Sequence, residues 1–147
     1  MSQANDSQHE TMTFKNLLLA FNHEAGLYFK LKYFQTIAEY EGRDDLSKLY
    51  ANMADLSKDQ VLGSLDFLRN IRDPHSQVPL GFSDVNLKSI QLFFSELSKT
   101  QYPEMALDAR NEGFTDIASW FDTLEKIKRV HLEKVESLII KRENYNG

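Results

Sequence analysis

Apolar residues recur every three or four positions along most of this chain, which is the spacing of amphipathic helices. Four such stretches are separated by two short breaks and one long break. They predict helices over about residues 11–41, 45–70, 83–111 and 115–142. The apolar positions that define these helices are Leu17, Phe21, Tyr28, Leu31, Leu46, Tyr50, Met53, Val61, Leu65, Leu68, Ile90, Phe94, Leu97, Ile117, Phe121, Leu124, Val135 and Leu138.

The breaks contain residues that interrupt helices. The short ones fall at Gly42 and Gly113, and two of the three prolines lie in the long connection over residues 73–81. Ser83 or Asp84 is expected to cap the third helix. Short, long and short connections between helices of roughly 25 to 30 residues are typical of a four-helix bundle with one crossover. We therefore predict an all-α fold of two antiparallel helix hairpins joined by a long crossover loop.

Composition narrows the class of protein further. The 147 residues suffice for one domain with its own core, and we expect a single bundle over residues 13–143 after a disordered polar tail over residues 1–12. The absence of cysteine excludes disulfides, thiolate metal sites and a cysteine nucleophile, and fits a cytoplasmic location. A net charge of −5 with dispersed Lys and Arg argues against nucleic acid as a partner. No apolar run approaches the roughly 18 residues that span a membrane.

The two halves of the chain resemble each other at an offset of about 71 residues. Duplication of a helix pair would explain this similarity. Two hairpins of similar length that happen to break at Glu-Gly would explain it as well. The matching positions are Glu41-Gly42 with Glu112-Gly113, Asp45 with Asp116, Leu46 with Ile117, Tyr50 with Phe121, Ser57 with Lys128, and Gln60 with His131.

Five segments of the chain follow one another in register over about residues 13–138. They are Leu17-Leu18-Leu19-Ala20-Phe21-Asn22-His23-Glu24; Tyr33-Phe34, Ala38 and Glu41-Gly42; Tyr50, Ala54 and Lys58; Tyr102-Pro103-Glu104 with Ala109-Arg110-Asn111-Glu112-Gly113-Phe114; and Ile117-Ala118-Ser119-Trp120-Phe121. Together these segments resemble the rubrerythrin branch of the ferritin-like proteins. The resemblance implies a ferritin-like four-helix bundle, a homodimer and peroxide reduction at two irons. Pro103, next to Tyr102 as in that family, implies a kinked third helix.

The resemblance also implies where metal ligands would lie, and most of them are replaced here. The family holds its irons with five Glu and two His, whereas only Glu24 and His131 retain a ligand side chain in this sequence. A bridged di-iron centre needs several carboxylates, so we expect no cofactor, or at most weakly bound iron or manganese at Glu24 and His131. The degenerate ligand positions are Ser57, Gln60, Phe94, Leu97 and Lys128.

The replacements leave Glu24 and Lys128 with opposite charges. An uncompensated buried carboxylate costs several kcal/mol, so one possibility is that Lys128 stands in for the metal by pairing with Glu24. The other is that Lys128 extends to solvent while a hydroxyl such as that of Tyr28 or Tyr50 binds Glu24.

Other candidate residues have simpler explanations. His23 adjoins Glu24, but consecutive helical residues point about 100° apart, so we expect His23 at the surface. Glu96 would replace the carboxylate missing at Leu97 only if the third helix rotated. His9 and His75 are expected to be solvated.

Two classes of function follow. The first is a non-catalytic bundle with a structural, interaction or stress-associated role, which is favoured because peroxide reduction in the family would require the dinuclear centre. The second is a divergent peroxide-defence oxidoreductase that uses a residual metal site or a redox-active tyrosine. No catalytic residue can be assigned from the sequence.

Overall fold

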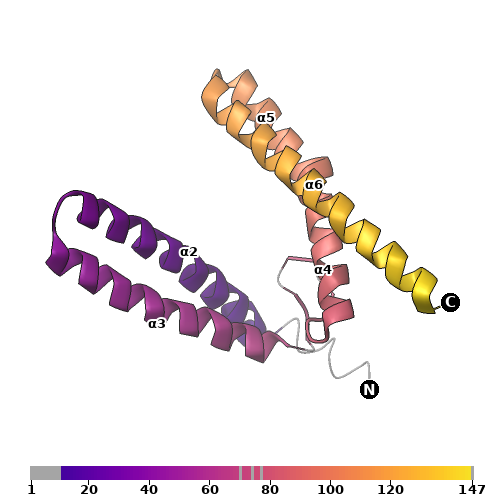
Figure 1. Cartoon of the computed structure of the whole chain (residues 1–147), viewed down its shortest axis with the longest axis horizontal. Helices are drawn as coiled ribbons and strands as arrows, with labels where there is room; N and C mark the ends of the chain where they lie inside the picture. The colour runs from indigo at the N-terminus through magenta and orange to yellow at the C-terminus, as the bar shows by residue number, and fades with distance from the viewer. Residues whose placement is uncertain (1–10, 70, 74, 77, 147) are drawn as a thin grey trace. The chain divides into compact units, whose positions relative to one another are not determined.

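The computed structural model of the chain, which describes residues 11–69, 71–73, 75, 76 and 78–146, confirms the all-α fold class (Figure 1). The chain forms two compact units that meet at Arg72 and Asp73. Each unit contains an antiparallel helix hairpin, and the described residues contain no β-strand. No helix in the described part of the chain is long and apolar enough to cross a membrane. The single bundle over residues 13–143 stays a prediction.

The first unit is a hairpin of α2 (Met12–Tyr40) and α3 (Asp44–Leu68). The Thr11 hydroxyl caps α2 by accepting a hydrogen bond from the Phe14 amide at 3.2 Å. The line of contact between the two helices, here called the seam, is apolar over most of its length. Its buried side chains are Phe14, Leu31 and Ala38 from α2 and Ala54, Ser57 and Leu68 from α3.

The second unit pairs a long helix with an interrupted one. The interrupted helix consists of α4 (Ser83–Glu96), η1 (Leu97–Gln101) and α5 (Tyr102–Asn111), and it packs on α6 (Thr115–Asn146). The predicted cap at Ser83 or Asp84 is wrong, because α4 begins at Ser83 with Phe82 as its N-cap. The Asn86 side chain fixes this start by accepting from the Gly81 amide at 2.9 Å and donating to the Gly81 carbonyl at 2.8 Å.

The expected irregularity near Pro103 is a single π-helical turn, η1. Proline cannot donate a backbone hydrogen bond, and its ring crowds the carbonyl four residues earlier. Just before the proline, the Tyr102 amide donates to the Leu97 carbonyl, five residues back, which widens the helix by one residue. The helix changes direction between α4 and α5 (Figure 1).

The two hairpin turns have the same hydrogen-bond geometry. In the first, the amides of Gly42 and Arg43 donate to the carbonyls of Glu39 and Ala38 at 3.1 and 2.8 Å. In the second, the amides at the positions 71 residues later, Gly113 and Phe114, donate to their equivalents at the same two distances. Both glycines have positive φ, 71° and 86°, as the Schellman motif requires. The internal similarity therefore extends to backbone geometry.

The connection before α4 is held by side chains. Asp73 Oδ2 accepts from the amides of His75 and Ser76 at 2.9 and 2.6 Å, and the hydroxyls of Ser76 and Ser89 are 2.8 Å apart. His75 is exposed, as expected for a solvated residue, but its ring also stacks on Phe93 with centroids 4.4 Å apart. Asp73, His75 and Ser76 are therefore linked to one another, and His75 and Ser76 contact α4.

Candidate functional site

The first hairpin contains three of the seven positions that the resemblance assigns to metal ligands. Ser57 is only 4% exposed and lies in the seam, whereas Gln60 faces solvent. Glu24 is half-buried, and its Oε2 atom is buried with no hydrogen-bond partner among the described residues. The hydroxyls of Tyr28 and Tyr50 therefore do not bind this oxygen. This oxygen is therefore open to a hydrogen-bond donor or a cation that the described residues do not supply.

The second hairpin contains the other four of these positions and brings three of them together. The Lys128 ammonium nitrogen lies 4.9 Å from the centre of the Phe94 ring, and the rings of Phe94 and His131 are 6.1 Å apart. Lys128 and His131 lie on one face of α6 because they are three residues apart. A cation over an aromatic face is an attractive arrangement, so Phe94 partners Lys128 within this unit.

Leu97 is the second apolar residue, after Phe94, at a position of the third helix where the resemblance expects a carboxylate. It is buried in η1, while its neighbour Glu96 is exposed at the end of α4. The helix is therefore not rotated to present Glu96 in its place. His23 is exposed on α2, as predicted, and His9 lies outside the described residues.

These side chains do not fit a di-iron centre. At the positions where the family resemblance expects carboxylates, the second hairpin offers a phenyl ring, a leucine and an ammonium group, none of which can ligate a hard cation. Among the described residues, no three His, Asp or Glu side chains cluster closely enough to hold a metal ion. Glu24 and His131 belong to different units. A residual metal site formed by the two, like a pairing of Glu24 with Lys128, stays a prediction.

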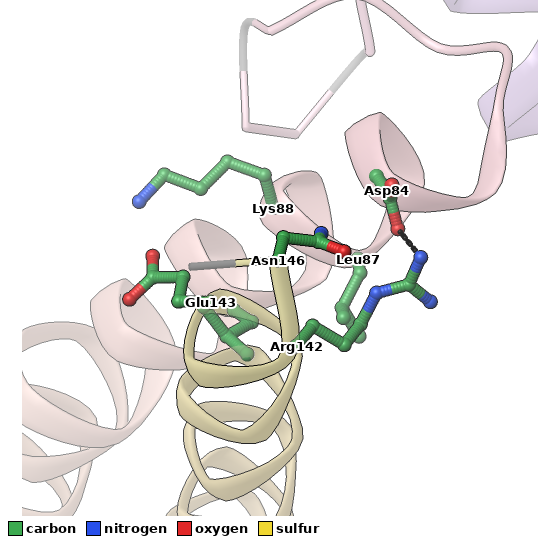
Figure 2. Close-up of a pocket in the computed structure, with 7 residues that line it drawn as sticks. Asp84, Leu87, Lys88, Arg142, Glu143 and Asn146 are labelled. Atoms are coloured by element: carbon green, nitrogen blue, oxygen red, sulfur yellow. Dashed lines mark ion pairs between the residues drawn. The ribbon is translucent and has the colours of Figure 1, made fainter.

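A groove that the sequence did not suggest lies between α4 and the end of α6, with a volume of about 460 Å³ (Figure 2). Arg142 reaches from α6 to Asp84 in the first turn of α4, at 2.7 Å. The side chains of Lys88 and Glu143 point away from this ion pair (Figure 2). Asp84 lies in the first turn of α4, where an acidic side chain is favourable, and this was the sequence signal for the ion pair. An exposed ion pair of this kind contributes at most about 1 kcal/mol. Opposite charges pair at the groove, which argues against a site for a charged ligand.

Comparison with known proteins indicates a distant relationship to rubrerythrins. No known family profile matches the chain. The rubrerythrin of Porphyromonas gingivalis is 25% identical over 142 residues, which cover 94% of this chain and 71% of that protein. The similarity extends over nearly the whole chain, as the five resembling segments do, so it supports a rubrerythrin-like helical protein.

Proposed function

We propose that this chain is a rubrerythrin-like protein that no longer uses a di-iron centre and acts as a structural or interaction protein associated with oxidative stress. The observation that carries the proposal is the contact between Lys128 and Phe94 at 4.9 Å. Two positions that the resemblance assigns to metal-binding carboxylates instead satisfy each other, because the ammonium lies over the ring face. A cytoplasmic location and a homodimer complete the proposal, and both are supported by the likeness to rubrerythrins.

Metal content tests this proposal directly. After reconstitution with Fe(II) or Mn(II) and removal of loosely bound ions, elemental analysis is expected to give well below one metal ion per chain. The matched control restores the ligand set with Ser57→Glu, Gln60→His, Phe94→Glu, Leu97→Glu and Lys128→Glu, and this variant should bind close to two ions. Nearly two tightly held ions in the parent protein would overturn the proposal.

A second candidate is a divergent peroxide-defence oxidoreductase. It is favoured by one observation, the buried Oε2 atom of Glu24 that has no partner among the described residues, because such an oxygen is available to a cation or a proton. Peroxide consumption by the same metal-loaded and metal-free samples distinguishes the two candidates. Turnover that disappears in Glu24→Gln while the helix content stays unchanged would favour the enzyme.

A further inference from the structure

The π turn η1 gives the interrupted helix of the second unit one more residue than a regular helix of the same length contains. Single π turns occur frequently at functional sites. In this one, the Tyr102 amide donates to the Leu97 carbonyl, and the following residue, Pro103, has no amide hydrogen. The Ser98 carbonyl therefore receives no hydrogen bond from the backbone donor of an α turn or of a π turn.

The extra residue changes which side chains of α4 share a face with α5. Three turns of a regular helix take about eleven residues, so Ser95 would lie on the same face as the buried Ala106. Ser98 would likewise share the face of the buried Ala109. With the π turn in place, Phe94 lies on this face instead of Ser95, and its ring meets a side chain of α6.

Leu97 and Ser98 are both buried, at 7% and 5% exposure, although they are neighbours in the sequence. Neighbouring residues of a regular helix point about 100° apart, so only one of them would normally face the partner helix. The hydrogen bond that the Ser98 hydroxyl donates to the Ser95 carbonyl is long, at 3.5 Å. A shift of α4 by one residue would therefore exchange Leu97 for a residue that is already buried beside it.

Hydrogen bonds at the start of α4 hold the helix in its present register. The hydroxyls of Ser89 and Ser76 are 2.8 Å apart, and the Asn86 side chain forms two hydrogen bonds with the Gly81 backbone. We call these three hydrogen bonds the clasp. A shift by one residue would move α4 about 1.5 Å along its axis and turn it by about 100°, which would break the clasp. Pro103 favours the same register, because in a regular helix its ring would crowd the carbonyl four residues earlier.

We propose that the interrupted helix has two registers and that the clasp selects between them. With the clasp closed, the helix contains the π turn, and the Phe94 ring lies under the Lys128 ammonium. With the clasp open, the helix is continuous, and the Tyr102 amide donates to the Ser98 carbonyl. Ser95 then takes the place of Phe94 beside Lys128. The connection before α4 thus controls whether a phenyl ring or a hydroxyl lies at the centre of the second hairpin.

This inference goes beyond the proposed function and uses contacts of the second unit alone. It predicts a conformational change whether or not the chain binds a metal. One backbone hydrogen bond favours the continuous helix, whereas the clasp and Pro103 favour the π turn. Loss of the clasp is therefore expected to shift the balance.

Two NMR signals of the full chain report the register. The methylene protons next to the Lys128 ammonium are expected to be shifted upfield by the ring beneath them, and Phe94→Leu gives their position without the ring. The coupling across the hydrogen bond of the Tyr102 amide identifies the acceptor carbonyl. Opening the clasp with Asn86→Ala and Ser89→Ala should remove most of the upfield shift, and the acceptor should change to the next residue along the chain.

The matched control removes the extra residue of the π turn. Deletion of Thr100 combined with Pro103→Ala gives a continuous helix in which α4 keeps its present register. Opening the clasp in that background should therefore change neither signal. Lys88→Ala should also leave both signals unchanged, because the hydrogen bond of Lys88 to Gln91, at 2.9 Å, stays within α4.

The expected result is a loss of the upfield shift together with a change of acceptor, and only when Thr100 is present. Unchanged signals in the open-clasp variant would overturn the proposal. So would an upfield shift that disappears without a change of acceptor, because Phe94 would then have turned without a shift of register. Ser89→Ala alone is a milder variant with the same expected direction, and it replaces the double substitution if circular dichroism shows reduced helix content.

Discussion

The α2–α3 hairpin and the helix pair of the second unit are alike where they turn and unlike at their centres. Both turns use a glycine with positive φ and the same pair of backbone hydrogen bonds. Halfway along the helices, the first hairpin buries a carboxylate oxygen that has no described partner, whereas the second places an ammonium over a phenyl ring. The two halves therefore share their turn geometry, while the side chains at the positions that the resemblance assigns to metal ligands differ between them.

The two hairpins differ in whether a charged side chain at their centre has a partner among the described residues. The cation of the second hairpin has an aromatic partner worth about 0.5 to 2 kcal/mol. The Oε2 atom of Glu24 in the first hairpin has no such compensation within the described residues. If a cation in the second hairpin paired with Glu24, the stability of each hairpin would depend on a charge in the other.

A double-mutant cycle on Glu24 and Lys128 is expected to show the largest effect. If the two groups compensate each other, Lys128→Met should lower the free energy of unfolding by about 2 to 3 kcal/mol, less than for a fully buried pair because both side chains are only half-buried. Glu24→Gln combined with Lys128→Met should recover much of this loss. Urea denaturation of the four proteins at neutral pH measures the coupling.

Lys128→Arg serves as the matched control, since it keeps a cation over the Phe94 ring and should stay close to the parent. Additive effects of Glu24→Gln and Lys128→Met would contradict interdependence. The stability of each hairpin would then depend on its own contacts, with water or a small cation at Glu24.

Substitution of the turn glycines should show a smaller effect that is equal in the two halves. Gly42→Ala and Gly113→Ala should each cost about 1 to 2 kcal/mol, because a side chain is strained at positive φ. Gly63→Ala is the control: it lies within α3, has room for a Cβ, and should stabilise by up to about 1 kcal/mol. Thermal unfolding measures all three variants. A difference above about 1 kcal/mol between the two turn variants would show that the turns are only superficially alike.

An ion pair beside the first turn should have the smallest effect. Arg43 donates to Asp45 at 3.2 and 3.1 Å, and this hydrogen bonding lowers the pKa of the Asp45 carboxyl from its ordinary value of 3.8. A lowered pKa means that the interaction is complete above 3.8 and is lost as the pH falls through the value in the folded protein. The second turn has Phe114 at the position of Arg43 and lacks the pair.

In Arg43→Gln, the pKa of Asp45 should therefore return towards 3.8, as an NMR titration of the carboxyl carbon would show. The thermal midpoint at neutral pH should hardly move, since both side chains are exposed. A pKa that stays low in Arg43→Gln would mean that the backbone at the start of α3 lowers it instead.

Local chemistry explains which parts of the fold could be predicted. Thr11, Gly42 and Gly113 begin or end a helix through hydrogen bonds that reach no further than one helical turn. The helix ends next to them therefore agree with the sequence prediction to within about two residues. Pro103 indicated an irregular third helix, but periodicity alone does not reveal the extra residue of a π turn. The start of α4 at Ser83 agrees with the prediction, but its N-cap was wrong, because Phe82 has no capping side chain and the two hydrogen bonds between Asn86 and Gly81 follow no common sequence rule.

The candidate site was predictable in part for a different reason. The resemblance placed Phe94, Lys128 and His131 at neighbouring ligand positions, and these side chains do lie together. The contact between Lys128 and Phe94 could not be predicted from charge pairing, because an aromatic ring carries no net charge. The groove at Asp84 and Arg142 was missed because those residues are 58 positions apart with no motif around either one.

The π turn at Leu97–Gln101 also affects how related sequences should be aligned. Ala106 and Ala109 are buried after the turn, as Leu97 is within it, yet a count in steps of 3.6 from Phe94 arrives at the exposed Met105 rather than at Ala106. A relative with a continuous α-helix here would be one residue shorter. Its sequence would match this one only with a gap inside the turn, and an ungapped alignment would pair core residues with surface residues on one side of it.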